Sequence, residues 1–303
     1  MVLLTVVATL AAGMVWQQWR AVVVEAAERG RVQSVWLLSS GLDYARLILR
    51  EDLRAEQRAG RGTSLADSWA TPLQETKLST MLAIDRDNNA PSDADVQAFL
   101  SGEIADAQSR YNLRHLVAGG KLVPAQVLVL ARLCSSAGLP TDVAQRLAQQ
   151  LHLAMSGVGE APLMPDTLDD LVWLGFDAAT IARLKPLVVL LPEDTPVNLN
   201  TATREVLAAV VPELDLGAAD RLVQARNRQA FNKLDDAMAA LGGAVVLPTN
   251  MVDVRSSYFE VTGRLRLEDR VLTERFLVRR RANGLEVKAL QRLREAGFVG
   301  EDR

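Results

Sequence analysis

The chain has 303 residues, of which 49% are hydrophobic and 23% are charged, as in ordinary folded proteins. Its formal net charge of −3 gives no reason to expect a nucleic-acid partner. The single cysteine, Cys134, excludes a disulfide within the chain and does not identify the compartment. This length allows two domains, or one domain with an insertion.

The chain begins with an uncharged run from Met1 to Trp19. At ~1.5 Å per residue, a helix of this length is about what a bilayer crossing requires. Arg20 ends the run, and no helix-breaking residue follows before Gly30. We therefore expect residues 1–20 to span a membrane and residues 21–55 to continue the same helix into water.

The uncharged run has two alternative interpretations. Small residues at Ala11, Ala12 and Gly13 would suit cleavage of a secretory signal, although no basic segment precedes them. A buried core helix is the other alternative. Trp16 and Trp19 favour the membrane interpretation, because tryptophan gathers at the boundary between lipid and water.

The pattern after the uncharged run is amphipathic. Apolar residues recur at steps of three and four, which predicts one apolar face on a helix. These residues are Val35, Leu38, Leu42, Ala45 and Leu49. We expect one continuous helix from about residue 2 to about residue 55, with its last third packed on a globular domain.

The middle of the chain changes character at Pro124. Residues 56–123 are mixed, with a strand expected at Gln108–Leu113. From Pro124, helices alternate with helix caps and glycine or proline breaks. The helix signals are Gly138 with Pro140, Thr141, Thr167 with Asp170, Asp177, and the segments Ala202–Val211, Ala218–Asn227 and Leu234–Leu241. We therefore expect an all-helical domain at residues 124–247.

The last part of the chain predicts strands. Apolar and polar residues alternate from Phe259 to Glu268, a second strand is expected at Leu272–Arg280, and Asn283-Gly284 is a hairpin signal before Leu285–Ala289. Residues 248–303 would thus return to the domain begun at residue 56. The expected fold class is α+β: a long N-terminal helix packed on an antiparallel sheet, with a large all-α insertion domain.

The sequence predicts no catalytic site. His115 and His152 have no other metal-ligand residue at a suitable spacing, and no phosphate-binding or nucleophile motif occurs. Asp85, Asp87 and Asn89 occupy the alternating positions of a calcium loop. The glycine and the bidentate glutamate of such a loop are missing, so these three residues are weak calcium candidates.

Several segments together resemble the minor pseudopilin K family of type II secretion systems. They are Glu28–Arg31, Val35–Leu38, Leu42–Asp52, Trp69–Leu73, Gly102–Gln108, Tyr111–Leu113, Pro196–Ala202 and Ser256–Val261. The resemblance runs over essentially the whole chain. It implies a pilin-like fold, a single-pass anchor in the inner membrane and a globular part in the periplasm.

The resemblance also implies processing and assembly. Family members are cut by prepilin peptidase, so Met1 is expected to be the mature, methylated N-terminus or a start assigned too late. Thr5 stands where most pilins carry a glutamate, whose carboxylate would need a partner in lipid. A subunit with no neighbour above it has no such partner, and the neutral Thr5 suits that position.

The family implies a place at the tip of the pseudopilus, in a complex with minor pseudopilins I and J. Pseudopilin H and the major pseudopilin are further expected partners. Small or apolar helix residues are expected to contact these partners, namely Val22, Val23, Ala26 and Ala27. Some members bind calcium in the helical domain, where acidic residues such as Asp215, Asp220, Asp235 and Asp236 are available in this chain.

Parts of the sequence are also compatible with two other functions. The segment Val197–Ala202 and the helices after it resemble a helix-hairpin-helix nucleic-acid module, in which Arg221, Arg226 and Arg228 would approach phosphate. The hairpin carries two acidic residues, which would repel phosphate. A minor pilin of a type IV pilus is the second alternative. No nucleic acid is expected as a partner.

Overall fold

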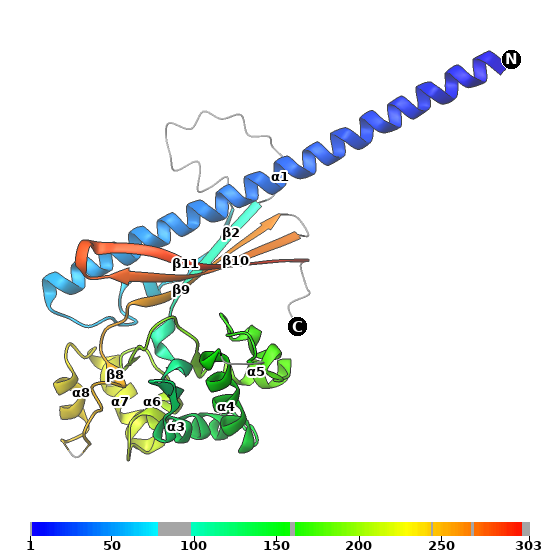
Figure 1. The fold of residues 1–303 in the computed structure, drawn as a ribbon. Coiled ribbons are helices and arrows are strands. Elements are labelled where there is room, and N and C mark those ends of the chain that lie inside the picture. Colours follow the sequence, from blue (N-terminus) through cyan, green and yellow to red (C-terminus); the bar gives the residue numbers. More distant parts are fainter. Residues whose placement is uncertain (1, 78–97, 158–160, 244, 268–269, 299–303) are drawn as a thin grey trace.

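A single long helix, α1 (Val2–Ala59), dominates the fold (Figure 1). The computed structural model describes residues 2–77, 98–157, 161–243, 245–267 and 270–298. The 58 residues of α1 reach roughly 87 Å at the usual helical rise. The predicted continuous helix is confirmed, and it ends four residues later than expected, just before Gly60, which has a positive φ of 61°.

The second half of α1 packs on a sheet through the apolar face predicted from the sequence. Leu38, Leu42, Ala45 and Leu49 are buried, whereas Val35 is only half-buried. A fully buried leucine contributes about 1.5–3 kcal/mol of transfer free energy, so this face supplies most of the driving force for docking α1. The same face continues through Leu53 to the end of the helix.

The sheet has five antiparallel strands in the order β1-β2-β9-β10-β11. The strands are β1 (Leu73–Lys77), β2 (Ala98–Asp106), β9 (Tyr258–Leu267), β10 (Arg270–Arg281) and β11 (Glu286–Phe298). The two predicted strands correspond to β9 and β10. Strand β11 is longer than expected, and β1 and β2 were not predicted.

The core between α1 and the sheet is built from alternating strand residues. Phe259 and Val261 of β9 and Phe276 and Val278 of β10 are buried beneath α1. Trp69, in the short 3-10 turn Ser68–Ala70, closes the end of this core with its ring edge toward Phe259, at 5.3 Å between ring centroids. We call α1 from residue 35, the 60–71 loop and the sheet the head.

The strand expected at Gln108–Leu113 is wrong in most of its length. The chain forms two 3-10 turns, Ala107–Ser109 and Leu113–Leu116, separated by the short β3 (Tyr111–Asn112). The reason is local. The side chains of Asp106 and Asn112 accept hydrogen bonds from backbone N–H groups two residues later, which holds turns in place of an extended strand.

A helical block follows. Its helices are α3 (Pro124–Ser136), α4 (Asp142–Ser156), α5 (Ala178–Leu184), α6 (Arg204–Val210), α7 (Leu216–Arg228) and α8 (Leu234–Ala240), with a 3-10 helix at Asp169–Leu174. The predicted helices are confirmed to within two residues. Short strands accompany them, pairing β3 with β6 (Val188–Val189), β4 (Val117–Ala118) with β5 (Lys121–Leu122), and β7 (Val197–Asn198) with β8 (Val252–Asp253).

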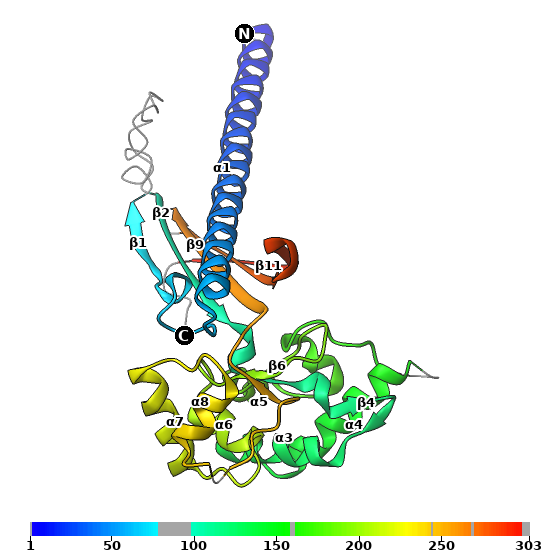
Figure 2. The same ribbon diagram turned by 90° about the vertical axis from the view of Figure 1, so that its left-hand side faces the viewer.

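The block has its own apolar core, whose buried residues run from Tyr111 to Val254. We call residues 111–254 the block. It is inserted between β2 and β9, which are neighbours in the sheet, and lies at the end of the molecule away from the N-terminus of α1 (Figures 1 and 2). The domain limits at residues 124 and 247 stay a prediction.

Candidate functional site

Asp106, the last residue of β2, is the centre of the junction between head and block. Its carboxylate is buried and accepts hydrogen bonds from the side chains of Asn198 (3.0 Å), Thr201 (2.6 Å) and Ser256 (2.6 Å). The backbone N–H of Gln108 donates a fourth bond at 2.8 Å. Burial raises the pKa of Asp106 above its ordinary value, against the opposing effect of these donors.

Asn198 and Asn200 extend this network into the block. The Asn198 side-chain amide bonds Asp106 and its oxygen accepts from the Asn200 N–H at 2.9 Å. Asn200 in turn exchanges two hydrogen bonds with the backbone of Phe231, at 2.8 and 2.9 Å. Both asparagines are buried, so each bond also avoids the cost of an unpaired amide.

The loop after α1 passes through the same junction. Thr63 is fully buried and donates its N–H to the carbonyl of Val254 at 2.9 Å, while its own carbonyl accepts from Asn198 at 3.2 Å. A Cβ on the neighbouring Gly62 would lie 2.5 Å from the carbonyl oxygen of Phe231. Only glycine allows this close approach, so the loop is fitted tightly to the block.

A buried ion pair ties the end of α1 to β10 beside the loop. Arg280 donates to both carboxylate oxygens of Glu56 at 2.9 Å and to the Thr63 hydroxyl at 2.6 Å. The guanidinium also lies over the ring of Phe259, 4.6 Å from its centroid. Burial raises the pKa of Glu56, and Arg280 opposes this effect. The junction is thus anchored on both α1 and the sheet.

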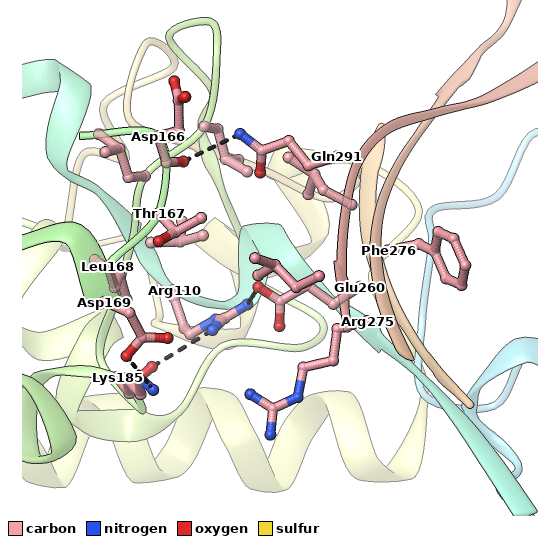
Figure 3. A pocket seen from close by; sticks show the side chains of 15 residues that line it. Arg110, Asp166, Thr167, Leu168, Asp169, Lys185, Glu260, Arg275, Phe276 and Gln291 are labelled. Atoms are coloured by element: carbon pink, nitrogen blue, oxygen red, sulfur yellow. Dashed lines mark hydrogen bonds and ion pairs between the residues drawn. The ribbon is translucent and has the colours of Figure 1, made fainter. Parts of the chain in front are cut away.

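The block also covers part of the sheet face that lies away from α1. Tyr258 and Leu277 of the sheet pack there against Val189 and Leu191 of the block and against Ala107, which follows β2. Beside this contact, a cleft of about 140 Å³ separates block and sheet (Figure 3). Ties across or beside it are Arg110 with Glu260 at 2.7 Å, Gln291 with the Asp166 carbonyl at 3.1 Å, and Arg279 with Glu193 at 2.5 and 2.7 Å.

The predicted assembly residues lie on α1, outside the head. Val22 and Val23 are exposed on the helix, where a partner could contact them. Thr5 also lies in α1, but its side chain, and those of Ala26 and Ala27, lie outside the described residues, as does Met1. Within the described part of the chain, no helix combines the length and the apolar character needed to cross a bilayer.

The structure uses several of the acidic calcium candidates as helix caps. Asp215 accepts from the Ala218 N–H at 2.6 Å, and Asp236 accepts from two N–H groups at the start of α8. Asp220 accepts from the Gln224 side chain, and Asp235 lies in the first turn of α8. Among the residues described, no group of three or more His, Cys, Asp or Glu side chains is arranged to hold a metal ion.

The weak calcium candidates Asp85, Asp87 and Asn89 lie outside the described residues, so calcium binding there stays a prediction. His115 and Cys134 are held within the fold. Nε2 of His115 lies 2.9 Å from the carbonyl oxygen of Thr195, and burial raises the pKa of Cys134 to about 11. A thiol with such a pKa is a poor nucleophile at neutral pH.

Arg226, one of the arginines considered for phosphate binding, points into the protein. It donates to the Leu199 carbonyl at 2.6 Å, and burial lowers its pKa to about 10. The hairpin between α6 and α7 presents Glu213 and Asp215 at its exposed surface. This arrangement does not favour the nucleic-acid alternative.

The junction residues were not predicted as a site, although they lie in segments that carry the family resemblance. Pro196–Ala202 supplies Asn198, Asn200 and Thr201, and Ser256–Val261 supplies Ser256. The signal was the run of short polar side chains in segments with little helix or strand pattern. Such residues often bond nearby backbone or one another when buried.

The fold and these surfaces together define the class of protein. A long helix that packs half its length on an antiparallel sheet and extends well beyond it is a pilin-like subunit, here with a helical block inserted at the far end of its head. The comparisons with known proteins narrow this class. The sequence model described as type II secretion system (T2SS), protein K, matches residues 197–255.

The type II secretion system protein K of Pseudomonas aeruginosa is 30% identical over 300 residues, covering 89% of this chain and 83% of that protein. The chain therefore belongs to the type II secretion system protein K family and is a minor pseudopilin. This finding confirms the resemblance in the sequence and does not favour the DNA-binding and type IV pilus alternatives.

A solved structure supports the fold. The chain is similar to the GspK-GspI-GspJ complex of the type 2 secretion system of enterotoxigenic Escherichia coli, with a TM-score of 0.64 and 20% identity. The similarity covers 89% of this chain and 98% of the matched chain. At this identity the match establishes the fold: a long helix on an antiparallel sheet with a helical insertion.

Proposed function

We propose that this minor pseudopilin caps the tip of the pseudopilus and supports protein export across the outer membrane. The observation that carries this proposal is the position of the block. It lies at the end of the molecule away from the N-terminus of α1 (Figure 2). A further subunit stacked above the head would have to enter the space that the block occupies.

The junction makes the block an effective obstruction. Asp106, Asn198 and Thr63 bind head, block and loop into one buried network, with further ties across the cleft. A block on a flexible linker could swing aside, whereas these directional bonds hold it in one orientation. We therefore expect the block to act as a fixed cap rather than as a mobile appendage.

Pseudopilins I and J are the proposed partners. The related structure is a complex of GspK with GspI and GspJ, and its fold matches this chain over most of its length. Exposed Val22 and Val23, together with Ala26 and Ala27, are the proposed contacts for the helices of these partners. Pseudopilin H and the major pseudopilin would lie further down the filament.

Residues 1–20 are proposed to anchor the protein in the inner membrane, with the rest of the chain in the periplasm and the leader removed by prepilin peptidase. The uncharged run of Met1–Trp19 supports this location. The guanidinium of Arg20 lies 5.8 Å from the ring centre of Trp16, a pair suited to a membrane surface. Thr5 would leave no unpaired carboxylate in the lipid.

The proposed role is structural and non-catalytic. Its direct test is the position of the protein in isolated pseudopili. Filaments labelled with antibodies against the block should carry the label at one end only, with the major subunit labelled along the shaft as a control. Labelling of the block along the shaft would contradict the cap. Recovery of a one-to-one-to-one complex with pseudopilins I and J from membranes would support the partners.

A further inference from the structure

Strand β11 lies at one edge of the sheet and is unusually long for that position. It runs from Glu286 to Phe298, whereas β1 at the opposite edge contains only Leu73–Lys77. β10 pairs with one side of β11, and no described strand pairs with the other side. The N–H and C=O groups of alternate residues along that side are therefore available to a further strand.

A bulge divides this unpaired side into two parts. The register with β10 shifts between Leu277 and Val278, which leaves Leu290 without a partner on β10. Residues 291–298 then pair with β10 without a further shift, and we call their unpaired side the free edge. Residues 292–296 are all exposed and include no proline. Such a regular, exposed edge is suited to strand addition.

The free edge carries unbalanced positive charge on the side of the sheet that faces α1. Arg292 pairs in register with Phe276, which is buried beneath α1, so Arg292 and Arg294 lie on that side. Both guanidiniums bond the carboxylate of Glu274, at 2.7 and 2.6 Å. The Glu274 side chain is fully buried, whereas those of Arg292 and Arg294 are 43% and 35% exposed. Two cations thus share one anion beside open water.

The other side of the free edge has a different character. Leu293 lies between the two arginines in sequence, points to the opposite side of the sheet and is 43% exposed. Glu295 on that side lies 3.7 Å from Arg275, which balances its charge. A strand that fits beside β11 therefore has acidic side chains at alternate positions and apolar side chains between them, because neighbours on adjacent strands stabilise each other when their charges are opposite.

The direction of β11 places the free edge toward the N-terminal part of α1. Leu272, which pairs with Ala296, belongs to the same apolar cluster as Leu38. Val287, near the start of β11, packs instead with the cluster of Leu49, further along α1. The free edge is thus on the part of the head that lies nearest to the proposed membrane anchor.

The distance from the anchor suits an extended segment. The anchor ends near Arg20, and the docked part of α1 begins near Val35, so the helix between them is roughly 20 Å long. About six or seven residues of extended chain cover this distance, since each adds ~3.3 Å. A chain that leaves the membrane beside α1 can therefore reach the free edge without a folded domain in between.

We propose that the free edge accepts, as an added strand, the extended segment that follows the membrane span of a second, non-pseudopilin protein of the inner membrane. Its acidic side chains meet Arg292 and Arg294, and an apolar side chain covers Leu293. A pseudopilin does not fit this role, because in this fold the chain beyond the anchor stays helical. The inference rests on the proposed anchor of residues 1–20, which sets the reach.

A short peptide tests the free edge directly. The probe is the fluorescent peptide Thr-Glu-Val-Glu-Val-Glu-Thr, titrated into the full chain in detergent. We expect saturable binding, and binding about tenfold weaker or less when lysine replaces the glutamates, because opposite charges on adjacent strands become like charges. Equal binding of both peptides, or binding of neither, would overturn the proposal.

Two variants of the chain locate the peptide. Arg294→Gln leaves one guanidinium on Glu274 and should weaken binding of the acidic peptide several-fold. Lys288→Gln is the matched control, because Lys288 is an exposed cation on the same strand before the bulge. Equal affinities of the two variants would show that the peptide does not lie at the free edge.

Backbone methylation separates strand addition from simple charge attraction. Two versions of the acidic peptide carry N-methyl groups on alternate residues, so that each version has one edge blocked. We expect one version to lose binding and the other to keep it, and the bound peptide to slow hydrogen exchange at alternate amides of residues 292–297. Equal binding of both versions would contradict an added strand.

Cross-linking in cells identifies the occupant. A photoreactive benzoylphenylalanine replaces exposed Ala296 in the full chain, with Lys288 replaced in a control. We expect residue 296 alone to cross-link to the segment next to the membrane span of an inner-membrane protein. No product, or a product with a pseudopilin, an exported protein or a second copy, would overturn the proposal. A chain found outside the inner membrane by fractionation would overturn both anchor and occupant, whereas an anchored chain that binds no peptide would overturn this inference alone.

Discussion

Two interfaces hold the molecule together, and they are chemically different. Where α1 meets the sheet, the contact consists mainly of leucine, alanine, phenylalanine and valine side chains around Trp69, with the buried Glu56–Arg280 pair at the end of the helix. Where the block meets the head, the contact is largely polar, with Asp106, Asn198 and Thr63 at its centre. The first joins residues on one periodic face, and the second joins single residues from distant segments.

The two interfaces differ in how strongly their contacts depend on geometry. Apolar burial depends on area and tolerates small shifts along the helix, so it docks α1 without fixing every contact. Buried hydrogen bonds depend on distance and angle and are costly when broken, so they fix the orientation of the block. A subunit that must present an obstruction in one position needs the second kind of interface.

The apolar interface should respond most strongly to a cavity. Leu49→Ala removes a side chain that has no exposure, between α1 and the sheet. We expect a loss of about 2–5 kcal/mol in the unfolding free energy of the head, measured by denaturant titration. Leu47→Ala, on the exposed side of the same helix, should change it by less than about 0.5 kcal/mol. Equal effects would contradict the packing described here.

The fit of the loop in the junction is tested by Gly62→Ala. The new Cβ would lie 2.5 and 2.6 Å from the carbonyl oxygens of Phe231 and Val254, and both are backbone atoms with little freedom to move. We expect a loss of about 1–3 kcal/mol and faster hydrogen exchange at the Thr63 and Asn200 amides. An unchanged melting temperature and exchange rate would show that the loop is loosely docked.

The buried carboxylate gives a prediction in pH. Because burial raises the folded pKa of Asp106, its contribution to stability is fully present below the ordinary pKa of aspartate and is lost as pH rises through the folded pKa. Asp106→Asn should flatten this dependence. At neutral pH it should also cost about 1–3 kcal/mol, since an NH₂ group replaces an oxygen that accepts bonds. Denaturant titrations from pH 4 to pH 7 measure both effects.

The smallest effect is expected for an exposed ion pair on α1. Glu51 and Arg54 lie 2.5 Å apart with side chains 54% and 39% exposed. Glu51→Gln should lower the unfolding free energy by no more than about 0.5 kcal/mol, and added salt should remove the difference. A loss as large as that of Asp106→Asn would mean that surface charge contributes to holding α1.

The apolar interface could be predicted from the sequence because its residues repeat at the regular spacing of a helix or a strand. Leu38, Leu42, Ala45 and Leu49 repeat at helical spacing, and Phe259, Val261 and Leu265 alternate as strand residues do. The helices of the block were equally clear from caps and breaks. Asp177 accepts the N–H bond of Thr180, as its position predicted, whereas Thr141 makes no capping hydrogen bond at the start of α4.

The remaining elements lacked such signals. Strand β1 is mostly exposed and short, and β2 is interrupted by Gly102 and small residues, so neither shows alternation over its length. The junction was not predictable because its residues are far apart in the sequence. Asp106 and Asn198 are separated by 92 residues, and Thr63 and Asn198 by 135. Their contact depends on where the chain re-enters the sheet after the block. No local sequence pattern indicates that position.

The position at which the chain re-enters the sheet after the block has a further consequence. Asp106, where the chain leaves β2, is paired in register with Phe259, where it re-enters the sheet in β9. Two antiparallel strands whose ends lie side by side need only a tight turn of about two residues to become a hairpin. The sheet order therefore does not depend on the residues between these ends, and insertion of one segment at the tip of a β2–β9 hairpin is enough to turn an uninterrupted sheet into this fold.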